Sequence, residues 1–355
     1  MSELDFTVDS QVGPYEVRFT DDALADLVSG PGRVVVLDQR VLELYRDAGA
    51  LSLDAATTVA VEAREDSKSL ERVPEIIEKL VAVGVRRSGE LVAVGGGITQ
   101  DIVAFIASIL FRGMDWSFVP TTLLAQSDSC IGSKSSINAA GTKNLVGTFR
   151  APCRVTIDVR FLRTLDDADI RSGIGEMLKV HAIAGAQSFD RLAAEYDDLL
   201  LDDAVMEAAI HRSLLFKREL IQIDEFDRGP RNVMNYGHSF GHAIEIATDY
   251  AVPHGIAVTI GMDLANYTSA SLGFSGWEQY ERMHPTLARN YLGFEHVAIN
   301  QDALLAALRR DKKNSARHLR LVLVNADGEI GLVDVEPEGA LVDAVRAYMD
   351  QSPFR

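Results

Sequence analysis

The sequence has few cysteines and no long apolar run. Its 355 residues include two cysteines, Cys130 and Cys153, which form no CxxC pair, so neither a disulfide framework nor a cysteine metal site is predicted. No apolar segment approaches the roughly 20 residues that a membrane-spanning helix needs. The N-terminal segment lacks the basic region and apolar stretch of a secretory signal. Together these absences predict a cytoplasmic protein with no membrane partner.

Basic residues are scarce beside acidic ones. The chain has 35 Lys and Arg against 52 Asp and Glu, a formal net charge of −17, which argues against nucleic acid as a main partner. The acidic residues are spread along the chain and do not form a tail, as is typical of a solubilising surface. Where Lys and Arg gather near Gly, Asn and His, they therefore suggest an anionic ligand.

The first half of the chain alternates short β-branched runs with helical patterns, and no repeat or low-complexity segment interrupts it. We expect strands at 33–38, 90–95 and 116–120, and helices at 69–83 and 101–110. This order predicts a parallel sheet with right-handed crossovers, in which ligands bind at the carboxyl ends of the strands.

The second half of the chain has a different pattern of apolar residues. It contains mainly helical patterns, and few segments are typical of strands before a predicted strand at 319–324. The helices are expected at 172–184, 204–223, 236–248, 256–270 and 302–310. Because the length also favours about two domains, we predict an α/β nucleotide-binding domain over 1–165 and a mostly helical domain over 166–355.

A glycine triplet, Gly95-Gly96-Gly97, lies between a predicted strand and a predicted helix. Glycine there lets backbone amides approach a pyrophosphate, whose charge a helix N-terminus favours. The triplet is not GxGxxG, and a tight turn without a ligand is an equally good interpretation. Asp38, at the end of an earlier strand, could bind a ribose hydroxyl or simply cap the next helix.

A second group contains histidines and a carboxylate. His238 and His242 lie one helical turn apart, on one face, which suits a metal held by two imidazoles, although hydrogen-bonded histidines at a helix start are the alternative. His254 could reach the same place from the next loop. Glu176 lies in a largely apolar helix, and a buried carboxylate needs a cation or a metal.

A third group is cationic. Lys134 and Lys143 bracket a stretch rich in Gly, Ser and Asn, a composition suited to phosphate contacts. The other members, each of which alone is more typical of a surface charge, are Arg112, Lys179, Lys217, Arg231, Lys312 and Lys313.

Taken together, these pieces resemble the 3-dehydroquinate synthase family of sugar-phosphate cyclases. The matching segments follow the family order and cover roughly residues 33 to 325. They are Gly95–Asp101, Arg112-Gly113, Val119–Ser129, Gly132–Lys134, Lys143–Gly147, Gly175–Lys179, Asp224-Glu225, Arg231–His242, His254-Gly255 and Asp311–Lys313.

The resemblance implies a Rossmann-like NAD-binding α/β domain, a mostly α-helical metal-binding domain, and a homodimer. By position, Glu176, His238 and His254 would hold Zn²⁺ or another divalent metal such as Co²⁺, and His242 would face the substrate phosphate. NAD would contact Asp38, Glu65, Lys68, Gly96, Gly97, Asp101, Thr121, Thr122, Asp128 and Lys143. The substrate would contact Arg112, Asp128, Lys134, Asn144, Lys179, Lys217, Arg231, Asn235, His242 and one of Lys312 or Lys313.

The implied reaction is the cyclisation of a phosphorylated sugar acid, 3-deoxy-D-arabino-heptulosonate 7-phosphate, in the shikimate pathway. NAD oxidises a substrate hydroxyl transiently, inorganic phosphate is eliminated, the hydride returns, and ring opening and an intramolecular aldol step close the carbocycle. The Lys and Arg residues would hold the flexible intermediates in a productive conformation.

Three segments depart from the family pattern: Ile98-Thr99-Gln100, Ser133, and Ala140-Gly141-Thr142. They lie beside the predicted NAD and phosphate sites, and so a cyclase acting on sedoheptulose 7-phosphate or an amino analogue is an alternative. Arg231 and Lys217 match positions around the substrate carboxylate, and Asn235 keeps the family pattern, which favours the carboxylated substrate.

Two other classes of protein are less well supported. An NAD- and metal-dependent alcohol dehydrogenase would have no need of the phosphate-binding set around Lys134, Lys143, Asn144 and Arg231. A non-catalytic relative would not be expected to keep all of Glu176, His238 and His254.

Overall fold

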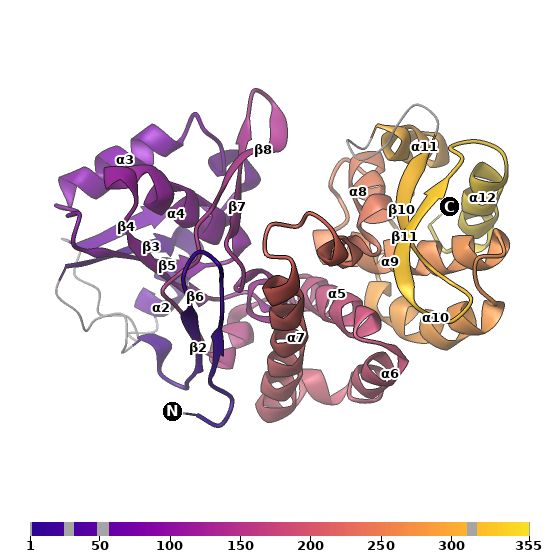
Figure 1. Ribbon diagram of the computed structural model, residues 1–355, viewed down its shortest axis with the longest axis horizontal. Coiled ribbons are helices and arrows are strands. Elements are labelled where there is room, and N and C mark those ends of the chain that lie inside the picture. Colours follow the sequence, from indigo (N-terminus) through magenta and orange to yellow (C-terminus); the bar gives the residue numbers. More distant parts are fainter. Residues whose placement is uncertain (1, 25–31, 48–56, 311–317, 355) are drawn as a thin grey trace. The chain divides into compact units, whose positions relative to one another are not determined.

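The computed structural model describes residues 2–24, 32–47, 57–310 and 318–354, and the chain forms two compact units (Figure 1). Unit 1 consists of Met1–Leu165 and Met206–Asp227, and unit 2 of Asp166–Val205 and Arg228–Arg355. Segment 206–227, which the predicted two-domain division places in the second domain, thus groups with unit 1. The predicted site residues Lys312 and Lys313 lie outside the described residues. None of the described helices is long and apolar enough to cross a membrane.

Unit 1 is built on a seven-stranded sheet of order β1-β2-β9-β6-β5-β3-β4, in which every neighbouring pair except β1–β2 is parallel. The strands are β1 (Phe6–Val8), β2 (Tyr15–Phe19), β3 (Arg33–Asp38), β4 (Thr58–Val61), β5 (Glu90–Gly95), β6 (Asp115–Pro120) and β9 (Arg154–Ile157). The three strands predicted from the β-branched runs are confirmed. Such apolar runs are typical of central strands in a parallel sheet, which are buried on both faces.

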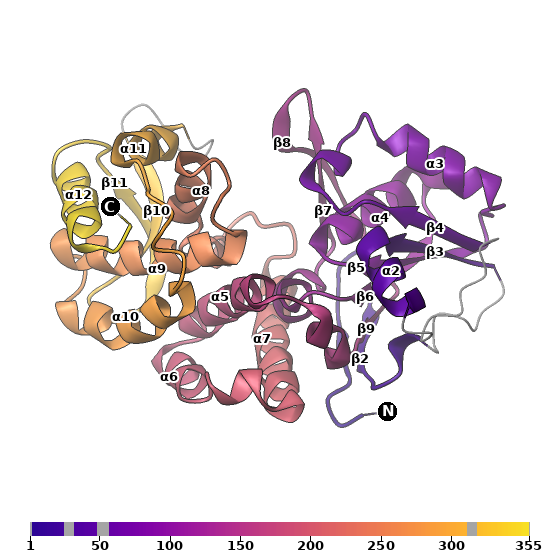
Figure 2. The same ribbon diagram turned by 180° about the vertical axis from the view of Figure 1, so that it is seen from behind.

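Helices cover both faces of this sheet. Val41 and Leu42 of α2 (Gln39–Asp47) share a buried cluster with alternate residues of β3 and β5, including Leu37 and Val94. Helices α3 (Val73–Ala82) and α4 (Gly97–Ile109) pack on the opposite face, as right-handed crossovers require (Figure 2). Helix α3 starts later than predicted, since Pro74 favours the first helical turn and disfavours helix before it.

The segment rich in Gly, Ser and Asn forms a two-stranded antiparallel ribbon, β7 (Lys134–Ala139) and β8 (Thr142–Phe149). Ala140 and Gly141 join the strands, with φ angles of 50° and 70°. Two left-handed residues in a row are what a two-residue hairpin turn of matching twist requires. The departure from the family pattern at 140–142 therefore lies in the turn of this ribbon. Helix α7 (Asp203–Ile223) runs mostly within unit 1.

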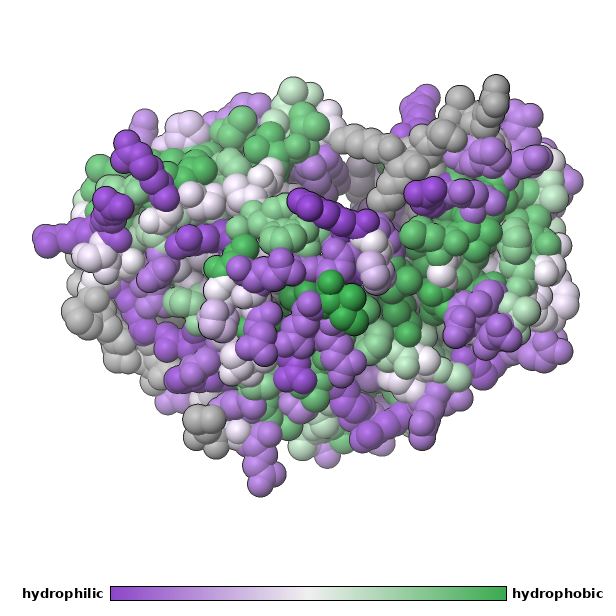
Figure 3. Space-filling view, in the orientation of Figure 1, coloured by the Kyte–Doolittle hydropathy of each residue, from purple (hydrophilic) through white to green (hydrophobic). Residues whose placement is uncertain are grey.

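Unit 2 is mostly helical, which confirms the predicted architecture. Its helices are α5 (Asp167–Ile183), α6 (Ala186–Ala194), α8 (His238–Ala247), α9 (His254–Ser271), α10 (Trp277–Tyr291), α11 (Gln301–Arg309) and α12 (Ala340–Gln351). The strands β10 (Leu319–Val324) and β11 (Ile330–Val335) form an antiparallel ribbon. Hydrophobic residues gather over this ribbon in Figure 3. Leu332 of β11 is exposed.

Helix α9 is the centre of unit 2, and glycines bring its neighbours close. A Cβ on Gly255 would collide with the backbone of Ser172 in α5, and a Cβ on Gly261 with the backbone of Gly237, which caps α8. Only glycine permits such approaches. Close packing of α5, α8 and α9 therefore determines where the side chains at their ends meet.

Candidate active site

The predicted NAD-binding residues of unit 1 gather at the carboxyl edge of the sheet. Asp38 ends β3, Gly96 caps α4 directly after β5, and Thr122 follows β6. A Cβ on Gly96 would lie 3.0 Å from the Thr122 side chain, and one on Gly95 would lie 3.2 Å from Cβ of Asp38. Burial raises the pKa of Asp38, although its Oδ1 accepts the Arg40 amide at 3.0 Å. The edge offers backbone amides, hydroxyls and a carboxylate in one place.

A hydrogen-bonded network joins three further predicted residues beside this edge. Lys68 Nζ lies 3.0 Å from Asp101 Oδ2 and 2.9 Å from Asn144 Oδ1. Ser136 of β7 donates its backbone N–H to Asp101 Oδ1 at 3.0 Å and its hydroxyl to Asn144 Oδ1 at 2.9 Å. Burial raises the pKa of Asp101 against the opposing effect of Lys68. The structure therefore brings Lys68, Asp101 and Asn144 together.

The ribbon also orients Glu65. Asn138 Nδ2 donates to Glu65 Oε1 at 2.7 Å, and Asn138 Oδ1 accepts the Asn144 amide at 2.8 Å. Asn144 has a φ of 52°, a left-handed conformation that asparagine tolerates better than most residues. Lys143, next to it, is exposed on β8. Ser136 and Asn138 were not singled out from the sequence, although the polar composition of their stretch is a signal that could have indicated them.

Two cationic residues of unit 1 pair with acids. Lys217 of α7 is buried, and its Nζ lies 2.5 Å from Asp128 Oδ1 and 2.6 Å from the Asp128 carbonyl oxygen. Asp128 lies in a π-helical turn, Ala125–Ser129. Lys134 is exposed and pairs with Asp227 Oδ2 at 3.0 Å. These pairs hold both lysines in place before any anion binds.

Arg112 lies in an unusual backbone conformation. Phe111 and Arg112 have φ angles of 53° and 68°, so two successive non-glycine residues are left-handed at the end of α4. Such residues cost of order 1–3 kcal/mol each and often accompany a functional site. The Arg112 side chain is exposed.

In unit 2, the predicted metal ligands come together from three helices. Glu176 of α5 is 2% exposed, and its Oε1 lies 3.5 Å from His238 Nε2 of α8 and 3.2 Å from His254 Nε2 of α9. Lys179 Nζ lies 2.6 Å from Glu176 Oε2, yet neither carboxylate oxygen has a hydrogen bond of suitable geometry. A buried carboxylate in this condition fits a divalent cation.

The two histidines are oriented by their other ring nitrogens. His238 Nδ1 lies 3.2 Å from the Tyr236 carbonyl oxygen, and His254 Nδ1 lies 3.3 Å from Glu245 Oε1. Each contact assigns the proton to Nδ1 and leaves Nε2 facing Glu176, the arrangement typical of metal-binding histidines. Glu245 is therefore a functional candidate whose orienting role the sequence did not indicate.

The electrostatics of the two histidines differ. Burial lowers the pKa of His238 to about 3, so its ring is neutral and able to act as a ligand. Burial acts to raise the pKa of Glu176, but Lys179, His238 and His254 outweigh it and hold that pKa well below its usual range. Burial would lower the pKa of His254, but the nearby carboxylates of Glu176 and Glu245 raise it to about 10, so this ring is protonated in the metal-free protein.

His242 lies beside the same cluster. Ligand atoms of His238, His242 and His254 all fall within 4.8 Å of one another, so a three-histidine site is also possible by distance. The His242 ring is stacked at 5.8 Å from His254, and its side chain is exposed. The choice of Glu176 over His242 as the third ligand stays a prediction.

Two predicted substrate residues of unit 2, Arg231 and Asn235, shortly precede the metal-ligand candidate His238 in the sequence. Arg231 and Asn235 belong to a short 3₁₀ segment, Pro230–Asn235, which packs on α5. Arg231 is buried, and Asn235 Nδ2 donates to the Asn232 carbonyl oxygen at 3.0 Å. Their contacts with a substrate stay predictions, as do the roles of the other site residues.

The fold and the site define a class of protein. One unit is a parallel α/β sheet with a glycine turn at its carboxyl edge, and the other is a helical unit with a histidine and carboxylate cluster. This is the class of two-unit enzymes that combine a nucleotide-type sheet with a metal site.

Comparison with known proteins gives the family. The family model described as 3-dehydroquinate synthase N-terminal matches residues 58–172, and the one described as 3-dehydroquinate synthase C-terminal matches residues 173–314. The chain is 35% identical to the 3-dehydroquinate synthase of Dictyoglomus thermophilum over 316 aligned residues. The alignment covers 88% of this chain and 88% of that one. The chain belongs to the 3-dehydroquinate synthase family and is an enzyme of that family.

Solved structures agree with the fold. The 2-epi-5-epi-valiolone synthase of Streptomyces hygroscopicus, solved with NAD⁺ and Zn²⁺, matches with a TM-score of 0.82 and 27% identity, over 95% of this chain and 97% of that one. A 2-deoxy-scyllo-inosose synthase, solved with carbaglucose-6-phosphate, NAD⁺ and Co²⁺, matches with a TM-score of 0.82 and 21% identity, over 97% and 99%. The predicted fold class is confirmed.

Proposed function

We propose that the protein is a 3-dehydroquinate synthase, which eliminates inorganic phosphate from 3-deoxy-D-arabino-heptulosonate 7-phosphate and closes a carbocycle. The observation that carries the proposal is the 35% identity to a 3-dehydroquinate synthase over 88% of both chains. The cluster of Glu176, His238 and His254 adds support, because a sequence that had lost this chemistry would not be expected to keep a buried carboxylate facing two imidazoles.

The cofactors proposed for the chain are NAD and a divalent metal, Zn²⁺ or Co²⁺. Glu176, His238 and His254 would hold the metal, and the glycine turn and Asp38 would contact NAD at the sheet edge. When bound, NAD supplies a hydride acceptor that is regenerated, and the metal lowers the pKa of a substrate hydroxyl. A related structure that holds NAD⁺ and Zn²⁺, at 27% identity, supports this assignment.

The chain's own residues would bind and orient the substrate. Lys134, Lys217 and Asn144 of unit 1, and Lys179, Arg231 and His242 of unit 2, offer donors for a phosphate and a carboxylate. Lys179 is buried beside Glu176 and so is held as a fixed positive charge. Positioning of this kind favours elimination and then ring closure by limiting the conformations of a flexible intermediate.

The carboxylate of the substrate is assigned to Arg231. Arg231 is 8% exposed, and a bidentate donor in a buried position is suited to a planar carboxylate. A substrate carboxylate left unpaired in the site would cost about 1–3 kcal/mol. A homodimer in the cytoplasm is part of the proposal and rests on the family alone.

The test measures phosphate release by the purified protein loaded with Zn²⁺ and catalytic NAD. The two substrates, 3-deoxy-D-arabino-heptulosonate 7-phosphate and sedoheptulose 7-phosphate, are offered separately. Turnover of the first alone is expected. Turnover of the second alone would overturn the substrate assignment and identify a cyclase of secondary metabolism. Stoichiometric release of NADH without phosphate would instead identify a dehydrogenase.

A matched pair of variants tests the role of Arg231. Arg231→Gln is expected to lower kcat/KM for the carboxylated substrate by about 10–100-fold, the effect of losing a charged hydrogen bond. The control is Arg346→Gln, which removes an exposed arginine paired with Asp302 at 3.2 Å and is expected to leave turnover unchanged. Equal effects of the two substitutions would contradict the assignment.

A further inference from the structure

Helix α9 carries two buried polar side chains one turn apart, Asp263 and Asn266, which are 0% and 1% exposed. The partners of Asp263 come from α10 and α12. His284 Nδ1 lies 2.8 Å from Asp263 Oδ2. The hydroxyls of Tyr348 and Tyr291 donate to the same oxygen at 2.9 Å and 3.2 Å. Asp263 therefore joins α9 to two neighbouring helices, and these contacts account for an acid in the core of unit 2.

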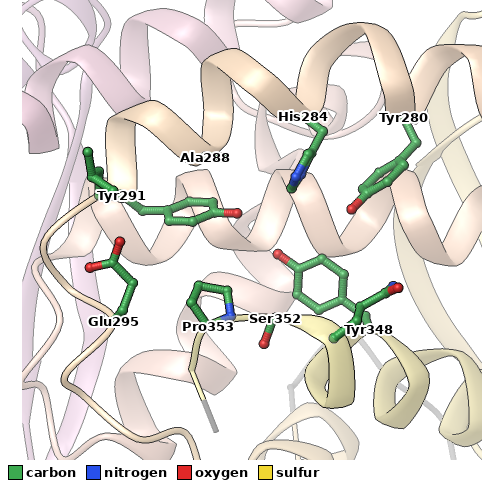
Figure 4. Close-up of a pocket in the computed structure, with 10 residues that line it drawn as sticks. Tyr280, His284, Ala288, Tyr291, Glu295, Tyr348, Ser352 and Pro353 are labelled. Atoms are coloured by element: carbon green, nitrogen blue, oxygen red, sulfur yellow. The ribbon is translucent and has the colours of Figure 1, made fainter.

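A pocket of about 400 Å³ lies beside this cluster, between α10 and the end of α12 (Figure 4). His284, Tyr291 and Tyr348 line it, and Glu295 lies further along the same pocket. Because Asp263 holds the first three of these side chains, the packing of the three helices accounts for their positions.

Asn266 has a different partner. Its Oδ1 accepts the hydroxyl of Tyr236, a residue that is 0% exposed. Among the described residues, the partner of its Nδ2 is the Met283 sulfur, a weak acceptor 3.5 Å away. An apolar side chain would fill this part of the core without the cost of burying an amide. The bond to Tyr236 is therefore the contact that accounts for an asparagine at this position.

Tyr236 is also the residue that orients His238. Its carbonyl oxygen lies 3.2 Å from His238 Nδ1, and only Gly237 separates the two residues in the sequence. Gly237 has a φ of 76°, and a Cβ on it would lie 2.7 Å from the Val258 carbonyl oxygen of α9. The junction before α8 is thus fixed on α9 twice, by its side chain at Asn266 and by its backbone at Val258.

The same helix begins with His254, another of the predicted metal ligands. Helix α9 therefore carries one imidazole directly and holds the carbonyl group that orients the other. The two rings lie 5.4 Å apart between centroids, and both Nε2 atoms face Glu176. One rigid element in this way sets the orientation of two ligands that come from different helices, as a precise site requires.

We propose that Asn266 is a positioning residue for the metal site. By holding the Tyr236 hydroxyl it fixes the Tyr236 carbonyl group, which keeps the proton of His238 on Nδ1 and its Nε2 toward Glu176. Partners that orient a metal-binding histidine directly change metal affinity by about 10–100-fold, so a residue one step further away should change it by about three- to tenfold. The zinc affinity rests on the proposed function, whereas the orientation of His238 does not.

The first test compares two tyrosines of unit 2. Tyr236→Phe removes only the hydroxyl. The matched control is Tyr196→Phe, because Tyr196 is 3% exposed and its hydroxyl donates to Asn290 Oδ1 at 2.8 Å. Both variants lose one buried hydrogen bond between a tyrosine and an asparagine, so both should unfold at similarly lower urea concentrations. In competition with a chelator, only Tyr236→Phe is expected to bind Zn²⁺ more weakly, by about three- to tenfold.

A double variant separates positioning from stability. Tyr236→Phe with Asn266→Leu removes both polar partners, so the urea midpoint should return toward that of the wild type. Zinc affinity should nevertheless stay as low as in Tyr236→Phe, because nothing holds the carbonyl group. Recovery of zinc affinity together with stability would show that the bond contributes to folding alone and would overturn the proposal.

The orientation of His238 is measured without metal, by NMR of the full-length protein with ¹⁵N-labelled histidine. The His238 signals are identified by their absence in His238→Gln. The wild type and Tyr196→Phe are expected to carry the proton on Nδ1, and Tyr236→Phe to shift toward a mixture of tautomers. Identical His238 signals in the wild type and Tyr236→Phe would contradict the proposal. If this shift is seen in a protein that binds no zinc, the proposed function fails and the positioning role stands.

Discussion

The two units treat their functional acids in different ways. In unit 1, Asp101 accepts hydrogen bonds from Lys68 and from the amide of Ser136. In unit 2, Glu176 is more deeply buried and close to two imidazoles, yet neither of its oxygens has a hydrogen bond of suitable geometry. One acid is both paired and hydrogen-bonded within the chain, and the other has an ion pair with Lys179 but no hydrogen bond.

The difference indicates what each site does with its ligand. A carboxylate that is already paired costs little in the free protein and serves to hold a lysine and an asparagine in place. Glu176 has an ion pair with Lys179, but its oxygens face two imidazoles without a hydrogen bond, so a divalent cation could join this carboxylate to the histidines. The contacts of Asp101 are therefore complete within the chain, whereas those of Glu176 would be completed by the metal that unit 2 is proposed to bind.

The largest effect is expected from Glu176→Gln. The substitution keeps the size of the side chain but removes the charge, and Zn²⁺ affinity should fall by more than about 100-fold, since even residues that only orient a ligand cost about 10–100-fold. Zinc content after dialysis against a competing chelator is the measurement. Glu245→Gln removes the charge of the acceptor for His254 Nδ1 but keeps an amide oxygen there, so it should lower Zn²⁺ affinity less than Glu176→Gln does.

His242→Asn is the matched control for this prediction, because His242 belongs to the alternative three-histidine set. If Glu176 is the third ligand, the His242→Asn protein should keep its zinc. Loss of zinc from His242→Asn together with its retention in Glu176→Gln would show that the three histidines hold the metal.

A smaller loss is expected from Lys68→Met, measured as the free energy of unfolding. The lysine is nearly buried and joins Asp101 and Asn144, so its removal should lower the free energy of unfolding by about 2 kcal/mol. Lys79→Met removes an exposed ion pair with Glu75, whose charged atoms lie 3.1 Å apart, and should change the free energy of unfolding by no more than about 0.5 kcal/mol. Similar losses in urea titrations of both variants would mean that the Asp101 network is no more than a surface contact.

A still smaller effect is expected where the sequence departs from the family pattern. Gln100 Nε2 donates to the Ser129 carbonyl oxygen at 2.7 Å, and the Ser129 hydroxyl donates to Gln100 Oε1 at 2.8 Å. Ser129→Ala should cost about 1 kcal/mol of unfolding free energy. Ser108→Ala, which removes a hydroxyl bonded only to the Phe105 carbonyl of its own helix, should cost less. If the order is reversed in urea titrations, the Gln100 pair does not fix the π-helical turn that carries Asp128.

Much of the fold could be predicted from the sequence, because its main signals are periodic. The strands at 33–38, 90–95 and 319–324 have the predicted bounds, since each is a short apolar run with clear ends. The ribbon of β7 and β8 was not predicted. Strand β8 is largely exposed and has no regular apolar alternation, and the turn depends on left-handed residues at 140 and 141 that the composition does not reveal.

The candidate site likewise has residues that the sequence indicated and contacts that it did not. Spacing favoured His238 with His242, because i and i+4 residues share a helix face. His254 and Glu176 were further candidates from their local sequence, and only the resemblance selected them, in place of His242, as the ligands that join His238 from α9 and α5. The close approach of those helices depends on Gly175 and Gly255, whose role appears only when the backbones are seen together. Likewise, the hydrogen bonds of Ser136, Asn138 and Glu245 are long-range or loop contacts that no local pattern encodes.

The smallest effect concerns Asp263, the buried acid of unit 2 that resembles the paired acid of unit 1. Its hydrogen bond raises the pKa of His284 above the value of about 6.5 for a free histidine. A raised folded-state pKa means that the stabilisation is fully present below about pH 6.5 and is lost as the pH rises through the folded-state pKa. Because the ring is 39% exposed, solvent screening should keep the effect to a fraction of a kcal/mol.

The measurement is the difference in unfolding free energy between the wild type and His284→Gln, compared at about pH 6 and about pH 9. The other titratable groups that face His284 are Asp263, Tyr280, Tyr291 and Tyr348, with Glu295 further along the pocket. Burial raises the pKa of the three tyrosines, so they stay protonated across this window. The difference should therefore shrink at the higher pH, and His296→Gln, at an exposed ring, should show no such trend. A difference that grows with pH would mean that Asp263 pairs with a neutral His284 ring, so that this buried acid, unlike Glu176 with its Lys179, has no cation beside it.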